Sequence, residues 1–175
     1  MMSRTPSAAP FWPYNLGQNL PGSFTARARG LFAPEFVLLG PGEEEFGRLR
    51  LGGIGDAQVR AEGFVAAFET SGRRYSMTAD GREILTARPK GHSADELEIF
   101  CDGRTYKAQI SPFRNLALAS QLGGEKAACL SGSLTGRSYE ALFAAKDKCA
   151  LPMAVFLLWR IVAIRRHAYR AGVTL

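Results

Sequence analysis

The stretch Cys149–Ile164 reads CALPMAVFLLWRIVAI, and it determines the fold of this chain more than any other segment. It is apolar on every helical face, with Arg160 as its only charge. Pro152 falls in what would be the first turn of a helix, where proline is tolerated. A helix without a polar face has to be surrounded by protein or by lipid on all sides. The segment therefore predicts a helix over about residues 150–168 in an apolar environment.

Two quantities favour protein rather than lipid around this helix. A bilayer core about 30 Å thick needs roughly 20 apolar residues, whereas this run spans only about 24 Å at 1.5 Å per residue. Arg160 near its centre would add about 2.5–3.5 kcal/mol against insertion. We therefore expect a helix buried inside the domain. The alternative is a tail anchor, held by the basic residues that follow it, with Arg160 reaching towards the interface.

The segment between Phe36 and the helix is divided into short runs that predict β-strands. Several joints between the runs are residue pairs that tolerate positive φ, as hairpin turns require. These joints are Asp80-Gly81, Asp102-Gly103 and Gly123-Gly124. The expected strands are Phe36–Leu39, Phe46–Leu51, Ala57–Ala61, Phe64–Thr70, Arg74–Thr78, Glu83–Arg88, Glu96–Cys101, Thr105–Ile110, Leu116–Leu122, Lys126–Ser131 and Ser138–Ala145. Such spacing predicts a mainly β fold, an antiparallel barrel of about twelve strands that encloses the C-terminal helix.

Residues 1–33 differ from the rest in their proline content and small residues. Proline lacks the backbone donor that a central strand or a helix needs. We therefore predict a Pro-rich N-terminal arm over 1–33, either flexible or docked through its aromatic residues, and a single β-barrel domain over 34–175. The arm contains no apolar core typical of a signal peptide, so we expect the protein in the cytoplasm. The prolines are Pro6, Pro10, Pro13 and Pro21, and the aromatic residues are Phe11, Trp12, Tyr14 and Phe24.

The composition indicates a globular, basic protein. Hydrophobic residues make up 46% of the chain and charged residues 22%, and the formal net charge is +6, which favours acidic partners. Cys101, Cys129 and Cys149 are odd in number and widely spaced, and the chain has two histidines, so no familiar zinc spacing is present. We expect buried, reduced thiols and neither a metal nor a cofactor.

Glycine-rich segments of the chain lack the residues that would make them catalytic. The run Gly52-Gly53-Ile54-Gly55 is not followed by the lysine and hydroxyl residue of a phosphate-binding loop. In the run from Gly132 to Gly136, the serine stands one place too early for a nucleophile elbow. Neither His92 nor His167 is paired with a nucleophile by the sequence. We therefore expect a protein that is not an enzyme.

Two local phrases and the order of elements resemble a known group of proteins. The phrases are Tyr75–Leu85 (YSMTADGREIL) and Gly136–Glu140 (GRSYE), and the order is short strands, a hydrophobic helix and then basic residues. Over about residues 34–168 the chain resembles the tubby C-terminal-like superfamily, which includes the phospholipid scramblases and the LURP-one-related proteins. The resemblance implies a twelve-stranded barrel around a central helix. Several members of this group bind phosphoinositides or associate with membranes.

The chain departs from the scramblases just before the helix. Scramblases carry an acidic calcium-binding stretch there, whereas this chain has Lys146-Asp147-Lys148. Calcium-driven scrambling is therefore not expected. The lysine and arginine ligands with which tubby binds phosphoinositides have no assignable counterparts, so no ligand residue is carried over from the family.

The basic residues supply the candidate site. Residues two apart on a strand share a face, so cations on neighbouring hairpins could form a basic wall beside the helix end. The alternative is that these charges are scattered to keep a strand-rich surface soluble and its edges unpaired. The candidate anion-binding surface comprises Arg73, Arg74, Arg82, Arg88, Lys90, Arg104 and Lys107, and the basic group at the helix end comprises Arg165, Arg166 and Arg170.

The leading functional hypothesis is a non-enzymatic binding or scaffold module that recognises anionic phospholipid, peripherally, at a membrane surface. One alternative is a tail-anchored membrane protein with a cytoplasmic β domain. Another, weaker one is a nucleic-acid-binding β barrel, which needs aromatic residues interleaved with cations for base stacking. Tyr75 beside Arg73 and Arg74, and Tyr106 beside Arg104 and Lys107, give only a weak indication of such stacking.

Overall fold

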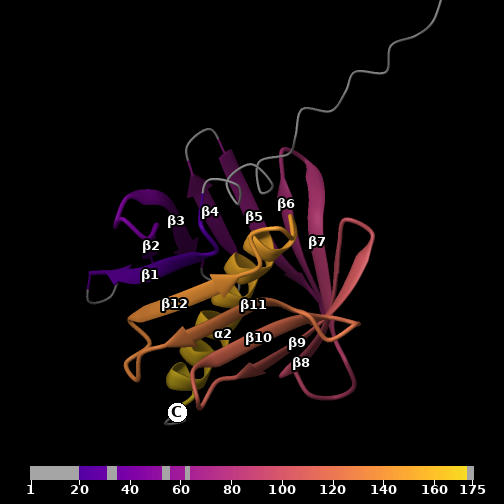
Figure 1. The fold of residues 1–175 in the computed structure, drawn as a ribbon. Coiled ribbons are helices and arrows are strands. Elements are labelled where there is room, and N and C mark those ends of the chain that lie inside the picture. The colour runs from indigo at the N-terminus through magenta and orange to yellow at the C-terminus, as the bar shows by residue number, and fades with distance from the viewer. Residues whose placement is uncertain (1–19, 31–34, 53–55, 62–63, 173–175) are drawn as a thin grey trace, which may run out of the picture.

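The structure is a computed structural model that describes residues 20–30, 35–52, 56–61 and 64–172. Twelve antiparallel strands form a closed barrel around one helix, in which each strand pairs with its neighbours in the chain and β1 also pairs with β12 (Figure 1). The strands are β1 (Ser23–Arg29), β2 (Glu35–Leu39), β3 (Glu45–Leu51), β4 (Ala57–Ala61), β5 (Phe64–Ser71), β6 (Arg74–Ala79), β7 (Arg82–Pro89), β8 (Glu96–Cys101), β9 (Arg104–Ser111), β10 (Leu116–Gln121), β11 (Lys126–Gly132) and β12 (Ser138–Phe143), and the helix is α2 (Ala150–Arg170).

The predicted barrel with an enclosed C-terminal helix is confirmed, and all eleven expected strands are present with boundaries that differ by at most two residues. The hairpin turns explain this agreement. Asp80 and Gly81 have φ of 49° and 71°, and Asp102 and Gly103 have φ of 49° and 73°. Two successive residues with positive φ match the right-handed twist of the flanking strands, so these pairs set the register of their hairpins.

The predicted boundary of the N-terminal arm at residue 33 is wrong, because residues 23–29 form β1. This strand lies between β12 and β2 and closes the barrel. Its buried side chains alternate with more exposed ones, and Phe24 and Ala26 point into the core. The prolines that suggested an arm end at Pro21 and therefore leave the backbone donors of β1 intact. Of the rest of the expected arm, residues 20–22 and 30 are described, whereas residues 1–19 and 31–33 lie outside the described residues.

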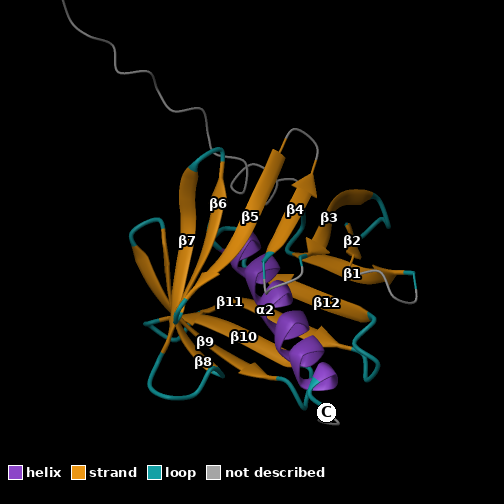
Figure 2. Ribbon diagram, turned by 180° about the vertical axis from the view of Figure 1, so that it is seen from behind, coloured by secondary structure: helices purple, strands orange, loops and turns teal. Residues whose placement is uncertain are grey.

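Helix α2 is buried from Ala150 to Val162 and lies inside the barrel (Figure 2). It packs most closely against β10, β11 and β12. The strands on this side present alanines to it, among them Ala117, Ala119 and Ala128. A side chain of this size lets the helix backbone approach the sheet, so the helix lies nearer to this wall than to the opposite one.

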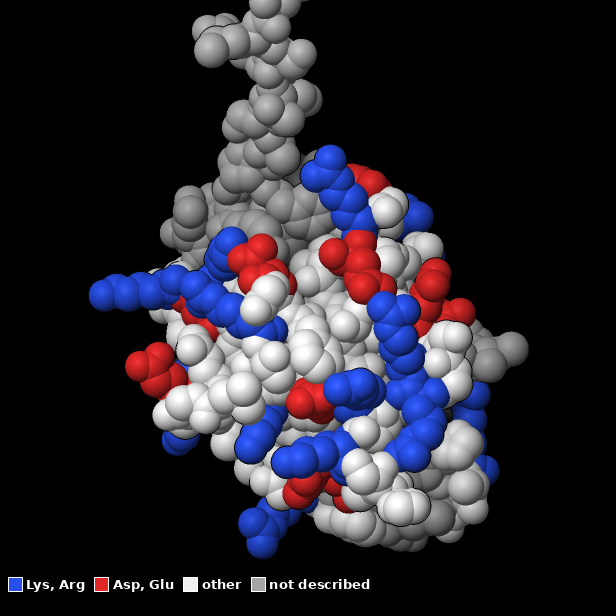
Figure 3. All heavy atoms as spheres, turned by 90° about the vertical axis from the view of Figure 1, so that its right-hand side faces the viewer, with Lys and Arg blue, Asp and Glu red and all other residues white. Residues whose placement is uncertain are grey.

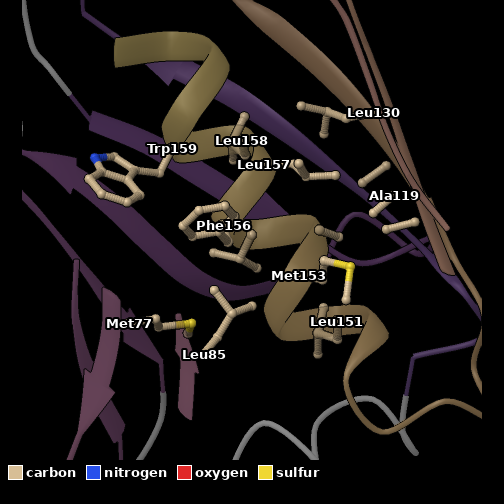
Figure 4. Packing of buried hydrophobic residues seen from close by; sticks show 14 of the residues in the cluster. Met77, Leu85, Ala119, Leu130, Leu151, Met153, Phe156, Leu157, Leu158 and Trp159 are labelled. Carbon is tan, nitrogen blue, oxygen red and sulfur yellow. The ribbon is translucent and has the colours of Figure 1, made fainter. Parts of the chain in front are cut away.

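The opposite wall fills the remaining space with large side chains. Figure 4 shows Met77 and Leu85 on one side of the helix, with Ala119 and Leu130 on the other. Trp159 projects towards the far wall and stacks on Phe68, with ring centroids 5.0 Å apart. Large residues on one side and small ones on the other keep the interior filled, as close packing requires.

The two ends of α2 define the two ends of the barrel. At the helix-start end lie the β6–β7, β8–β9 and β10–β11 turns and the connection from β12 to α2. At the other end lie the β5–β6, β7–β8, β9–β10 and β11–β12 connections, together with the last turns of the helix. None of the helices in the described residues combines the length and apolarity needed to cross a bilayer.

Candidate functional site

The seven basic residues of the expected anion-binding surface do not lie together. Because β6 to β9 alternate in direction, successive turns fall at opposite ends of the barrel. Arg82 and Arg104 begin β7 and β9 at the helix-start end. Lys107 lies within β9, opposite Glu98 of β8. The other four, Arg73, Arg74, Arg88 and Lys90, lie towards the end where α2 finishes.

Most of these cations are also paired. Arg74 binds Glu83 at 2.7 Å, Arg88 binds Glu98 at 2.8 Å, and Arg104 lies 3.6 Å from Asp147. Arg73 donates a hydrogen bond to the carbonyl oxygen of Gly91. Figure 3 shows the result on the side of the barrel that carries β6 to β8, where acidic and basic side chains are interspersed. Three of the seven cations, Arg74, Arg88 and Arg104, therefore already have an acidic partner.

The tyrosines considered for base stacking are not at the surface. Tyr106 is fully buried, and its hydroxyl donates to Asp147 at 2.9 Å. Tyr75 is buried beneath the guanidinium of Arg160, which lies 3.8 Å from the ring centroid. Neither ring has a free face for a nucleobase.

A different set of residues gathers where α2 ends. Arg165 donates hydrogen bonds to the carbonyl oxygens of Pro112 at 2.8 Å and of Leu134 at 3.1 Å. These two bonds attach the β9–β10 turn and the β11–β12 loop to the end of the helix. We call this region the helix-end tip, and it comprises residues 112–115, 133–137 and 165–170.

Asn115 holds the two loops of the helix-end tip against each other. Its side-chain amide donates to the carbonyl oxygen of Ser133 at 2.6 Å. Its backbone carbonyl oxygen accepts a hydrogen bond from the backbone N–H of Gly132 at 2.8 Å. Asn115 has φ of 52°, a conformation that asparagine adopts more readily than most residues. A Cβ at Gly132 would lie 2.2 Å from the Asn115 side chain, so this contact requires glycine. The loops are therefore positioned by local chemistry.

Large apolar side chains are exposed at this tip. Phe113 is 73% exposed, Leu134 is 96% exposed and Tyr169 is 85% exposed. The backbone next to Phe113 and that of Leu134 both bind Arg165, so the two loops share one place. Tyr169 follows Arg165 by four residues and lies on the same face of the helix, one turn further out. We refer to these three exposed side chains, which lie at the same end of the barrel, as the exposed apolar cluster.

The arginines of the helix-end tip have no acidic counterpart within it. The helix-end tip contains Arg114, Arg137, Arg165, Arg166 and Arg170, and no aspartate or glutamate. Arg137 and Arg165 bind backbone carbonyls, whereas Arg114, Arg166 and Arg170 form no ion pair within the described residues. Partial burial and the neighbouring Arg170 lower the pKa of the Arg166 guanidinium, which remains charged at neutral pH.

Of this tip, only the helical arginines Arg165, Arg166 and Arg170 are expected from the sequence. Phe113 and Leu134 lie in the turn sequences Pro-Phe-Arg-Asn and Ser-Leu-Thr-Gly. A large apolar residue inside a turn sequence is a usable signal, because turns are otherwise polar. The meeting of the two turns could not be recognised, since it depends on the order of strands around the barrel.

The helix-start end is organised around Asp147, whose side chain is only 7% exposed. Asp147 accepts hydrogen bonds from the Tyr106 hydroxyl at 2.9 Å, from the Gln121 amide at 3.3 Å and from the backbone of Cys149 at 2.9 Å. Burial and the hydrogen bond to Asp147 raise the pKa of Tyr106. This network joins β9, β10 and the start of α2, and its polar groups form hydrogen bonds with one another.

The thiols agree with expectation for two of the three cysteines. Cys101 and Cys149 are buried and free, whereas Cys129 is free but only half-buried. The Cys149 thiol donates to the carbonyl oxygen of Cys101 at 3.5 Å. Across the described residues there is no group of three or more histidine, cysteine or acidic side chains arranged to hold a metal ion.

Comparison with known proteins identifies the fold. No protein-family model and no curated protein sequence matches the chain. Among solved structures, the X-ray structure of an Arabidopsis thaliana protein matches with a TM-score of 0.56 and 12% sequence identity, over 82% of this chain and 93% of the other. At this identity the similarity supports the barrel with its helix and carries no information about a site.

Proposed function

We propose that this protein is a non-enzymatic binding module that docks on membranes containing anionic phospholipid, through the helix-end tip. The observation that carries the proposal is the exposed cluster of Phe113, Leu134 and Tyr169 within a region that has arginines and no acidic residue. Exposed apolar groups of this kind mark interaction surfaces rather than ordinary solvent-facing regions. A surface that combines apolar side chains with uncompensated cations is complementary to the headgroup region of an anionic bilayer.

Both the apolar side chains and the cations of the helix-end tip would contribute to such binding. Transfer of Phe113 and Leu134 from water into the acyl boundary would contribute up to about 1.5–3 kcal/mol each for complete burial. Each cation near an anionic leaflet contributes about 1 kcal/mol at moderate salt. The aromatic ring of Tyr169 has an apolar body and a polar hydroxyl, which suits the boundary between headgroups and tails. Together these terms are sufficient for reversible, peripheral attachment.

The rigidity of the helix-end tip supports the same function. Arg165 and Asn115 hold the two loops in place before any lipid is met, so little conformational entropy is lost on docking. Because the loops project from one end of the barrel, the domain can approach a flat membrane with this end leading. The barrel would then act as a scaffold whose other surfaces remain in water.

We further propose that the chain is a member of the tubby C-terminal-like superfamily. The closed twelve-stranded barrel around a hydrophobic helix agrees with the architecture that the sequence resemblance implied. Membrane association in several members of that group is consistent with docking through the helix-end tip. The tip itself is identified from this chain's own residues and not from the group.

Binding to vesicles tests the proposal directly. The full chain is mixed with vesicles of phosphatidylcholine alone and with vesicles that contain phosphatidylserine, and the bound fraction is measured by flotation at low salt. We expect binding to the anionic vesicles only. The double variant Phe113→Ser with Leu134→Ser is expected to weaken this binding about tenfold or more, because the apolar term is removed.

A matched control lies at the opposite end of the barrel. Leu122 is 61% exposed in the β10–β11 turn, so Leu122→Ser removes a comparable exposed side chain without touching the tip. This variant should bind as the unchanged protein does. Equal loss of binding in the control and in the double variant, or equal binding to both vesicle types, would show that the helix-end tip is not a membrane-docking surface.

A further inference from the structure

Arg160 is a charged residue in the most apolar part of the molecule. It lies within the buried stretch of α2 and is 8% exposed. No carboxylate among the described residues lies within ion-pair distance of its guanidinium. A buried charge is normally paired, because its removal from water is costly.

Two aromatic rings contact the guanidinium of Arg160. The group lies over the ring of Tyr75, 3.8 Å from the centroid, and 5.2 Å from the centroid of Trp159. Such stacking uses the flat face of the guanidinium, whereas its five N–H donors lie in the plane. Nε is buried and has no hydrogen-bond partner. Stacking on the two rings therefore leaves at least this in-plane donor without an acceptor.

The neighbouring strands cannot supply the missing anion. The acidic residues of β7 and β8 are on the outer surface, where Glu83 and Glu98 are already bound to arginines. Burial lowers the pKa of Arg160, which is the direction expected for a charge that lacks a counter-ion. Tyr75 is the second residue of β6, next to the β5–β6 turn, so the guanidinium lies near the mouth of the barrel at the end where α2 finishes.

We propose that Arg160, with Tyr75 beneath it, forms a binding site for a small oxyanion, a phosphate or carboxylate group that enters from this mouth. The fork of in-plane donors matches the two oxygens of such a group and can bind it through parallel hydrogen bonds. The bound anion would supply the charge that the strands do not. This site is separate from the helix-end tip: Arg160 and Arg165 are five residues apart, about 140° around the helix.

Thermal unfolding with and without inorganic phosphate tests this site. The full chain is compared in chloride and in phosphate at the same ionic strength and pH. We expect phosphate to raise Tm by roughly 3–6 °C at a concentration about ten times its dissociation constant. Arg160→Met removes the charge but keeps an apolar side chain, so this variant should fold in chloride and lose the shift. Arg160→Lys keeps the charge without the fork and should retain less than half of the shift.

The control variant is Arg82→Met, which removes an exposed cation at the opposite end of the barrel. It should show the full phosphate shift. An equal shift in the unchanged protein and in Arg160→Met would overturn the proposal, because phosphate would then be acting on the surface charges. An unchanged protein that phosphate does not stabilise, and whose binding to phosphatidate vesicles is unaffected by Arg160→Met, would overturn it as well.

Vesicles distinguish the two sources of the oxyanion. If the group belongs to a lipid, Arg160→Met weakens binding to vesicles that expose the phosphomonoester of phosphatidate, but not to phosphatidylserine vesicles. If the group is a free anion, inorganic phosphate stabilises the chain, and Arg160→Met binds both kinds of vesicle as the unchanged protein does. Either result supports an oxyanion site at Arg160, and neither depends on membrane docking by the helix-end tip.

Discussion

The two ends of the barrel solve the same problem, the ends of a buried helix, in different ways. At the helix-start end, Asp147 is enclosed and accepts hydrogen bonds from Tyr106, Gln121 and the backbone of Cys149. At the helix-end tip, Arg165 also binds backbone carbonyls, but the surrounding arginines have no acidic partner, and Phe113 and Leu134 extend into solvent. The polar groups around Asp147 are therefore hydrogen-bonded to one another, whereas the helix-end tip has exposed apolar side chains and arginines without an acidic partner.

This difference indicates which end serves the fold and which serves an interaction. Groups that satisfy one another stabilise the folded chain and have little left for a partner. Apolar side chains in water and like charges side by side do not stabilise the isolated protein, so their collection in one place indicates a binding surface. The three predictions below test this division, from the largest expected effect to the smallest.

The largest effect is expected from Asp147→Ala at the helix-start end. The substitution leaves the buried Tyr106 hydroxyl and the backbone N–H of Cys149, the N-cap residue of α2, without their acceptor. We expect a loss of about 2–4 kcal/mol in the free energy of unfolding, measured by chemical denaturation. Binding to phosphatidylserine vesicles should be unchanged under conditions in which the variant is folded.

A control for this variant is Asp95→Ala. The Asp95 carboxylate is exposed and forms no hydrogen bond or ion pair with a described residue, and only its backbone is engaged. Its loss should alter stability by less than about 0.5 kcal/mol. If Asp147→Ala is no more destabilising than Asp95→Ala, the helix-start end is not the stabilising end of the molecule.

An intermediate effect is expected from Arg166→Gln combined with Arg170→Gln at the helix-end tip. Two cations that each contribute about 1 kcal/mol at an anionic surface correspond to about 30-fold weaker binding to phosphatidylserine vesicles. The difference from the unchanged protein should disappear at high salt, because salt screens exposed charges. Stability should be unchanged or slightly increased, since two neighbouring like charges are removed. Undiminished binding at low salt would leave the arginines with no role in docking.

The smallest effect is expected from Arg88→Ala, on the outer surface of β7. Arg88 is paired with Glu98 and lies 5.3 Å from the Phe100 ring centroid, all at the surface. Exposed ion pairs contribute about 0–1 kcal/mol, so the free energy of unfolding should change by no more than this. Vesicle affinity should stay within about twofold, because the charge is already compensated. A larger loss of affinity would indicate that the binding surface lies on β6 to β9, as expected from the sequence.

Much of the fold could be predicted because its signals are local. The Asp-Gly pairs at 80–81 and 102–103 select hairpin turns on their own, and the apolar run from Cys149 demands an enclosing wall whatever its neighbours are. The strand that was missed, Ser23–Arg29, has the same alternation as the others. Its pattern is less apparent in the sequence because the prolines before it dominate the composition of the segment.

The candidate site was less predictable, since it depends on which turns share an end of the barrel. The basic residues from Arg73 to Lys107 lie close together in the sequence, but alternate strand directions divide them between both ends. Phe113 and Leu134 lie in two different turns, which meet because Arg165 binds the carbonyl oxygens of Pro112 and Leu134. Tyr75 and Tyr106 resemble stacking residues in the sequence, yet strand alternation turns both into the core.

The sequence by itself determined the barrel and its buried helix, because hydrophobic periodicity and turn chemistry act over a few neighbouring residues. Only the tertiary structure decided where charge remains uncompensated and where apolar side chains stay in water. These properties depend on the partners that closure of the barrel brings together, such as Asp147 with Tyr106, or leaves apart, such as Arg160 from any described carboxylate. Pairing across the fold is a long-range outcome, and no local pattern contains it.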